Sequence, residues 1–331
     1  MCFVGNRGHY RYAVDALKYL PELEVSAVSA GCNDDITNLL SELSKNNIKP
    51  RIYDNSKLMI DDIHPDIVCV SGQFEKHAEF SNYALSKGIH VFCEKPVALK
   101  LSDLEALKKT YESVKGNSVQ FTSMLAYRHE PIFINAAEMI ANGEIGEIKM
   151  ITTQKSYIFG NRPDYYKQRS TYGGTIPWIG IHQIDWIYWF GKSKFKSVFA
   201  SHRAEKKSNS GEIEMTALFI FEMQNGIIAS GNCDFLRPTT APSHGDDRVR
   251  VAGSEGILEI IEREISLINA EGVKKISFPE QAFNPIFLNF VNAIQGNERL
   301  AMSPEETFYV TEVCLLARES ADTNKIIRLT D

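Results

Sequence analysis

The chain has 331 residues, a formal net charge of −6, and 44% hydrophobic and 24% charged residues. This balance is typical of globular proteins and excludes a disordered or fibrous chain. No Lys/Arg-rich block is present, so nucleic acid and anionic membranes are poor candidates for the main partner. The sequence shows no long apolar run, no export signal and no C-x-x-C pair among its six cysteines. These absences predict a soluble cytoplasmic protein with reduced thiols.

Short β-rich runs alternate with amphipathic stretches in the first third of the chain. The patterns predict helices at residues 10–20, 75–87 and 101–114, and strands at 2–4, 24–29, 50–53, 67–70, 90–93 and 119–121. The apolar run at 67–70 is typical of a strand that is covered on both faces. Strands and helices in this alternation predict a doubly wound parallel sheet. We therefore expect a Rossmann-type dinucleotide-binding domain over residues 1–122.

From residue 123 onward strands dominate, which predicts an α+β domain over residues 123–331 with a large open, mainly antiparallel sheet. Further strands are expected at 227–234, 248–252, 257–261 and 265–268, and helices at 131–142, 285–295 and 304–320. The segment 212–222 alternates with period two and has one fully apolar face. Leu218 and Ile220 lie on its other face, which indicates that this face is also covered. A second copy of the chain is the simplest cover, in a homodimer or homotetramer.

The turn after the first strand has the sequence Gly5-Asn6-Arg7-Gly8-His9. Between a strand and a helix, such a turn presents backbone N–H groups to a phosphate. Arg7 and Tyr10 stand where G-x-G-x-x-G has glycine, so an ordinary glycine-containing turn is the alternative. Ser29 ends the second strand; it supplies no carboxylate for the ribose of NAD and repels no 2′-phosphate. The residues thus leave NAD and NADP both open.

The run Cys93-Glu94-Lys95-Pro96 follows the fifth strand. Ligands of open α/β sheets collect outside the carboxyl ends of the strands. Lys95 is therefore a candidate for hydrogen bonding to a substrate hydroxyl, with a solvated charge pair as the alternative.

Four ordered groups of residues resemble the glucose–fructose oxidoreductase/inositol dehydrogenase (Gfo/Idh/MocA) family, at that family's spacing and over nearly the whole chain. They are His77-Ala78-Glu79 with Glu94-Lys95-Pro96, then Arg128 to Ile148, then Gly173-Gly174 with Gly180 to Asp185, and finally Ala252 to Glu259. The resemblance implies that NAD or NADP lies across the first domain. It also implies that a sugar or polyol substrate lies over the sheet of the second domain.

The resemblance also implies roles for individual residues. Lys95 would bind the reacting hydroxyl and assist proton movement, and His182 would be the general acid/base, a role that suits an imidazole near neutral pH. Glu94 would line the nicotinamide side of the cofactor site. Gly72-Gln73-Phe74 would border the track from adenosine to nicotinamide. His77 would lie in the same cofactor region, at the start of a helix, with a structural rather than a catalytic role.

One position departs from the family pattern. The family usually has an aspartate four residues before the histidine, and this chain has Trp178 there. Trp178 cannot orient His182 as a carboxylate would, but it can stack against a sugar ring or the nicotinamide. The loop before Gly173 is rich in tyrosine and arginine, which suit stacking and the binding of a carboxylate or phosphate. The expected substrate residues are Tyr127, Arg169, Tyr172, Trp178, His182 and Asp185.

The leading interpretation is an NAD(P)-dependent oxidoreductase that acts on a sugar, polyol or sugar derivative. Two alternatives stay open: a redox-neutral NAD-dependent elimination of the glycosidase type, and a cofactor-binding sensor with little catalysis. The histidines show no metal-ligand spacing such as H-E-x-x-H, so no metal site is expected.

Overall fold

The computed structural model describes residues 1–32, 34–204 and 210–329. The chain forms two compact units, the N-terminal unit of Met1–His129 with Ala282–Thr311 and the C-terminal unit of Glu130–Gln281 with Glu312–Asp331. This division differs from a single boundary after residue 122, because a late segment returns to the N-terminal unit. Helix α9 (Ile286–Ile294) belongs to that segment. Its Phe287 and Phe290 rings lie 5.1 and 5.4 Å from the ring of Phe92, inside the N-terminal core.

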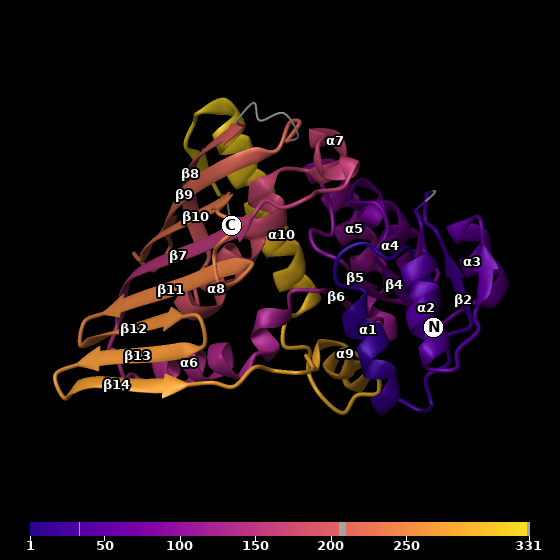
Figure 1. Cartoon of the computed structure of the whole chain (residues 1–331), viewed down its shortest axis with the longest axis horizontal. Coiled ribbons are helices and arrows are strands. Elements are labelled where there is room, and N and C mark those ends of the chain that lie inside the picture. The colour runs from indigo at the N-terminus through magenta and orange to yellow at the C-terminus, as the bar shows by residue number, and fades with distance from the viewer. Residues whose placement is uncertain (33, 205–209, 330–331) are drawn as a thin grey trace. The chain divides into compact units, whose positions relative to one another are not determined.

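The N-terminal unit is built on a six-stranded parallel sheet in the order β3-β2-β1-β4-β5-β6 (Figure 1). Its strands are β1 (Cys2–Val4), β2 (Ala27–Ser29), β3 (Arg51–Tyr53), β4 (Ile67–Val70), β5 (His90–Cys93) and β6 (Phe121–Ser123). The order reverses between β1 and β4, the point at which doubly wound sheets bind ligands. The predicted doubly wound parallel sheet is confirmed.

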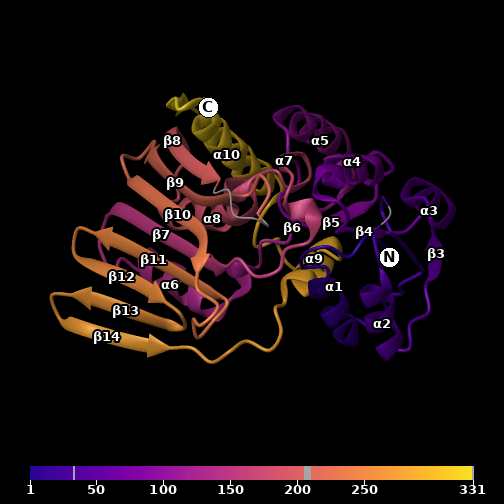
Figure 2. The same ribbon diagram turned by 45° about the horizontal axis from the view of Figure 1, so that its top comes forward.

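Helices cover both faces of this sheet. One core contains residues from α1 (Arg11–Ala16), α2 (Thr37–Lys45) and α9. The other helices of the unit are α3 (Ser56–Ile63), α4 (His77–Ser86) and α5 (Leu101–Val114), of which α4 and α5 pack together (Figures 1 and 2). Every residue of β1 and β4 is buried, as a sheet covered on both faces requires.

The C-terminal unit contains a nine-stranded, mainly antiparallel sheet in the order β14-β13-β12-β11-β7-β10-β9-β8-β15. Its strands are β7 (Ile148–Ile158), β8 (Phe195–Ala204), β9 (Glu214–Met223), β10 (Ile228–Arg237), β11 (Gly245–Gly253), β12 (Gly256–Ile261), β13 (Glu264–Asn269), β14 (Gly272–Ser277) and β15 (Ile327–Arg328). Among the described strands of this sheet, only the β7–β10 pair is parallel. The predicted open, mainly antiparallel sheet is confirmed.

One face of this sheet carries helices, and we call it the inner face. Helix α8 (Ile181–Gly191) packs on β7 and β10, and α6 (Pro131–Ala141) packs on β12 and β13 (Figure 2). The unit also contains the single turn α7 (Arg169–Tyr172). Helix α10 (Pro304–Thr323) begins in the N-terminal unit and ends in the C-terminal unit.

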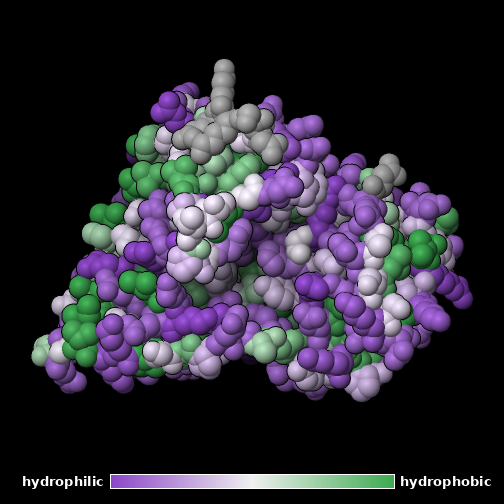
Figure 3. Space-filling model, viewed as in Figure 1, coloured by the Kyte–Doolittle hydropathy of each residue, from purple (hydrophilic) through white to green (hydrophobic). Residues whose placement is uncertain are grey.

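The opposite, outer face of the sheet carries apolar side chains that remain exposed in the single chain. Leu218 and Ile220 on β9 are 49% and 45% exposed. Green, hydrophobic side chains also gather over these strands in Figure 3. Exposed neighbours on β7, β8 and β10 extend the patch: Met150, Phe199, Ile228 and Leu236. No helix in the described parts of the chain combines the length and the apolar character needed to cross a bilayer.

Candidate functional site

The turns after β1 and β4 approach each other so closely that both need glycine. Gly5 has φ +74°, and a Cβ atom there would lie 2.3 Å from Cα of Gly72. The backbone is fixed by hydrogen bonds from Gly5 N to Ser29 O and from Ser71 N to Val4 O, both 2.8 Å long. Because neither glycine carries a side chain, a ligand at the switch point can approach the main chain directly.

The buried carboxylate of Glu94 holds the turn after β1 in place. Glu94 follows β5 and has no exposed surface. It accepts a 2.6 Å hydrogen bond from the His9 backbone N–H, and its Oε2 lies 3.0 Å from His9 Nδ1. Gly8 has φ +63°, and a Cβ atom there would lie 2.5 Å from Glu94 Oε2. Burial alone would raise the pKa of Glu94, but the interactions with His9 and Lys95 lower it, so the carboxylate stays ionised.

The loops after β1, β2 and β4 are joined by side chains. Arg7 forms an ion pair with Asp34, and its guanidinium carbon lies 5.9 Å from the centre of the Phe74 ring. Gln73 donates a 2.8 Å hydrogen bond from its side chain to the Cys32 carbonyl. In the sequence Asp34 lies several residues beyond Ser29, and its pairing with Arg7 spans 27 positions, so sequence reasoning did not connect the two.

Ser29 is fully buried at the end of β2, with its hydroxyl 2.7 Å from that of Ser56. Asn6 is half-buried in the turn after β1, between the glycines. The structure thus brings together the predicted residues of the turns after β1, β2, β4 and β5.

Lys95 is 3% exposed and is joined to Pro96 by a cis peptide bond. His77 lies beneath this segment, fully buried at the start of α4. Its Nδ1 is 2.9 Å from the Pro96 carbonyl oxygen and its Nε2 is 3.2 Å from that of Gly72. Burial lowers the pKa of His77 despite these two acceptors. His77 therefore connects the loop that carries Lys95 to the glycine turn.

In the C-terminal unit, His182 lies in the first turn of α8 and is 8% exposed. A π-helical turn, Ile176–Gly180, leads into this helix. The Phe219 ring of β9 packs against the backbone of Gly231 on β10 and of Gly180 in the π-helical turn. A Cβ atom on Gly231 would lie 2.3 Å from this ring, and one on Gly180 would lie 3.1 Å from it. The lack of side chains at these glycines lets the turn before His182 lie close to the sheet. Asp185 is buried one helical turn later.

Trp178 lies inside the π-helical turn and is 7% exposed. Its ring centre is 5.5 Å from that of Tyr166 and 6.4 Å from that of Tyr172. Tyr166 in turn packs on Tyr172 at 5.4 Å. Two predicted substrate residues, Tyr172 and Trp178, thus share one aromatic cluster with Tyr166.

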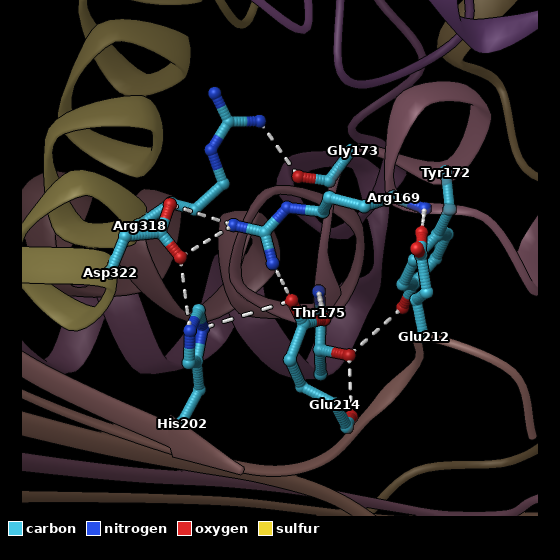
Figure 4. Close-up of polar contacts among 9 residues, drawn as sticks. All are labelled: Arg169, Tyr172, Gly173, Thr175, His202, Glu212, Glu214, Arg318 and Asp322. Atoms are coloured by element: carbon cyan, nitrogen blue, oxygen red, sulfur yellow. Dashed lines mark hydrogen bonds and ion pairs between the residues drawn. The ribbon is translucent and has the colours of Figure 1, made fainter. Parts of the chain in front are cut away.

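Arg169 is an ion-pair residue in this structure (Figure 4). Its guanidinium forms ion pairs with Glu214 on β9 and with Asp322 on α10, the latter at 2.9 Å. His202 Nε2 lies 3.1 Å from Asp322, and Thr175 N donates a 3.0 Å hydrogen bond to Glu214. Sequence reasoning assigned Arg169 to the substrate; here two carboxylates neutralise its charge.

The same cluster fixes the glycine pair that precedes the π-helical turn. Gly173 and Gly174 have φ values of 84° and 112°, which side chains rarely adopt. Arg318 donates a 2.7 Å hydrogen bond to the Gly173 carbonyl (Figure 4). A Cβ atom on Gly174 would lie 3.2 Å from the Arg169 guanidinium, and Arg169 N donates to Glu212 at 2.6 Å. The cluster therefore braces the chain just before Trp178 and His182.

Tyr127 lies in a 3-10 turn of the N-terminal unit, Ala126–His129, whereas the other expected substrate residues belong to the C-terminal unit. No signal in the sequence indicated a buried charged group on the inner face of the large sheet. Lys155 on β7 has no exposed surface; it pairs with Asp247, and its ammonium lies 4.8 Å from the Trp186 ring centre.

No group of three or more metal-ligating side chains occurs among the described residues. The glycine turns after β1 and β4 fit a dinucleotide. They bring two backbone segments close together at the topological switch point of the sheet, and buried side chains support them.

The pH dependence of the free energy of unfolding tests the surroundings of Glu130, a partly buried carboxyl group near Lys155. Burial raises the pKa of Glu130 to about 7, with Asp247 adding to the shift and Lys155 opposing it. Because the pKa is higher in the folded state, the stabilisation is complete below about pH 4.5 and is lost as the pH rises through 7. We expect Glu130→Gln to raise the free energy of unfolding at pH 8 by on the order of 1–3 kcal/mol, and to change it little at pH 4.5.

Urea denaturation at the two pH values measures this difference. Glu138→Gln, on the exposed face of the following helix, is the matched control. Parallel pH–stability curves for wild type and Glu130→Gln would contradict the assignment.

Comparison with known proteins agrees with this geometry. Residues 5–122 match the oxidoreductase family with an NAD-binding Rossmann fold, and residues 133–259 match the Gfo/Idh/MocA C-terminal domain. A solved structure from Thermotoga maritima, provisionally described as an oxidoreductase, is 40% identical; the match covers 99% of both chains with a TM-score of 0.94.

Several curated relatives are named as inositol dehydrogenases. The myo-inositol 2-dehydrogenase of Thermotoga maritima is 23% identical over 294 residues, which is 85% of each chain. The inositol 2-dehydrogenase of Salmonella paratyphi B is 26% identical over 156 residues, 47% of this chain and 44% of the relative. The chain thus matches less than half of the length of that second relative. The matches to both family models and to a full-length structure show that the chain belongs to the Gfo/Idh/MocA oxidoreductase family.

Proposed function

We propose that the protein is an NAD-dependent oxidoreductase that transfers a hydride between the nicotinamide and a hydroxyl-bearing carbon of a sugar, polyol or sugar derivative. The observation that carries the proposal is Lys95, a buried ammonium group at the carboxyl end of β5 in an NAD-binding fold. Relatives named as inositol dehydrogenases support a sugar or polyol as the substrate class. The six free cysteines, five of them buried, suit a reducing compartment, and we place the enzyme in the cytoplasm.

The residues for the dinucleotide come from the turns described above. The backbone from Gly5 to His9 would hold the pyrophosphate, and Gly72 to Phe74 would line the path toward the nicotinamide. Asp34 has a buried Oδ2 with no hydrogen-bond partner among the described residues. As the first described carboxylate after β2, it is our candidate acceptor for the ribose hydroxyls, which favours NADH over NADPH.

When bound, the nicotinamide supplies the hydride acceptor or donor. Lys95 would donate a hydrogen bond to the substrate oxygen and stabilise the negative charge that develops there. His182 would take the hydroxyl proton as the general base, and return it in the reverse direction. Trp178 stands where the family usually has an aspartate near the histidine, and it would contribute an aromatic surface for the sugar ring.

Replacement of Lys95 tests the catalytic assignment. We expect Lys95→Ala to lower kcat for a screened sugar or polyol by about 10²- to 10⁴-fold, since it removes the cation at the developing alkoxide. Calorimetric binding of NADH should stay within a few-fold of wild type. Lys100→Ala, at an exposed position in the same loop, is the control. Full activity in the Lys95 variant would remove this residue from the mechanism.

Replacement of Gly8 tests the cofactor assignment. The methyl group of Gly8→Ala would clash with the Glu94 carboxylate and displace the turn. We expect the Kd for NADH, measured by calorimetry, to rise at least about tenfold. Gly88→Ala has the same backbone strain, at φ +75°, but no atom within 4 Å, and should bind NADH normally. Equal NADH binding by the two variants would show that this turn does not hold the dinucleotide.

The outer face of the large sheet supports a homo-oligomer. Its exposed apolar side chains would be buried against a second copy, as a homodimer or homotetramer. We expect the double change Leu218→Asp/Ile220→Asp to yield monomers by light scattering, because it places charges in that interface. Leu58→Asp changes an exposed leucine of the N-terminal unit and should leave the assembly intact. A wild-type monomer at micromolar concentration would refute the proposal.

A further inference from the structure

The loop between β7 and α7 carries two arginines with different surroundings. Arg169 is neutralised by Glu214 and Asp322. Arg162 instead donates to two backbone carbonyls, from Nε to Phe159 at 2.9 Å and from Nη2 to Ile158 at 3.5 Å. No carboxylate pairs with Arg162 among the residues that the structure describes. Its positive charge is therefore uncompensated by an acidic side chain.

Two aromatic rings lie against the Arg162 guanidinium. Its central carbon lies 5.0 Å from the ring centre of Phe235 and 5.4 Å from that of Tyr166. Rings on a guanidinium exclude water from its faces and leave its edge as the place for hydrogen bonds. Guanidinium has five N–H groups and the two carbonyls occupy two of them, so donors remain for a ligand. The side chain itself is half-buried.

Aromatic side chains and a histidine lie near Arg162. The ring of His244 packs on Tyr157 at 5.3 Å, beside the end of β7. Burial lowers the pKa of His244, and the positive charge of Arg162 lowers it further, so the two groups lie within electrostatic reach of each other. Arg237, at the end of β10, is compensated by Asp246 at 3.5 Å. An anion placed at Arg162 would thus meet a cation that no carboxylate of the described residues pairs with.

The position of Arg162 connects it to the proposed substrate site. Tyr166, which packs on Arg162, also contacts Trp178 at 5.5 Å between ring centres. Trp178 precedes His182 by one helical turn. Arg162 therefore lies one aromatic ring away from the residue that we assign to sugar stacking.

We propose that Arg162 binds an anionic group of the substrate, a carboxylate or a phosphate, so that the substrate is a sugar acid or a sugar phosphate rather than a neutral polyol. A guanidinium fork matches both anions, through parallel charge-assisted hydrogen bonds. This assignment rests on the proposed function, because His182 and Trp178 define where the substrate lies.

Binding without turnover tests the assignment directly. Calorimetry would compare D-gluconate, D-glucose 6-phosphate and the neutral myo-inositol on the full-length protein. We expect one of the two anions to bind at least about tenfold more tightly than myo-inositol, and the stronger anion identifies the group as carboxylate or phosphate. Arg162→Gln should raise the Kd for that anion by about 10- to 100-fold and leave binding of myo-inositol unchanged.

Two further variants separate charge from structure. Arg162→Lys keeps the charge but lacks the fork, so it should recover part of the affinity. Arg203→Gln removes an exposed arginine of the same unit and should bind the anion as wild type does. The assignment is overturned if wild type binds neither anion more tightly than myo-inositol, or if Arg162→Gln binds the anions normally.

Turnover with NAD⁺ keeps the two proposals apart. Anion binding that depends on Arg162, together with no oxidation of any sugar or polyol, would uphold the anion site and refute the proposed function. Oxidation of myo-inositol with the same KM in wild type and Arg162→Gln, and no preference for anions, would uphold the function and refute the anion site.

Discussion

The buried carboxylate of Glu94 is the constraint on which the N-terminal unit depends. A carboxylate without solvent exposure must be satisfied by hydrogen bonds or opposite charge, and His9 supplies both a backbone N–H and a ring nitrogen. This requirement fixes the turn after β1 at the end of β5. It also forbids a side chain on Gly8. Lys95 follows Glu94 directly, so the same contact positions the proposed catalytic ammonium relative to the turn that would hold the cofactor.

The C-terminal unit uses a second buried carboxylate in a comparable way. Glu214 is 3% exposed, pairs with Arg169 and accepts a hydrogen bond from Thr175 N. The segment that it holds leads into Trp178 and His182. Phe219, five residues further along the same strand, seats that segment on the sheet. In both units, therefore, a buried glutamate with hydrogen-bond and ion-pair partners holds in place the segment that leads to the proposed reacting residues.

The two arginines of the β7–α7 loop show how pairing decides the role of a charge. Both belong to the same tyrosine-rich segment, and residue type alone suits either one to an anionic ligand. Two carboxylates make Arg169 part of the brace, whereas aromatic rings and carbonyls surround Arg162 and leave its charge available. In our proposal, substrate recognition in this unit thus depends on which of the two arginines the protein itself has neutralised.

The sequence by itself determined the fold class, the strands 67–70 and 90–93, the helix 101–114, the glycine turn and the Glu94-Lys95 motif, because each depends on local periodicity or a short run. It missed β7, where the buried Lys155 breaks the apolar alternation, and the return of α9 to the first unit. Only the tertiary structure decided that Arg7 pairs with Asp34 and Arg169 with Asp322, which lie 27 and 153 positions away. Such pairings follow from packing between distant segments, and no local pattern encodes them.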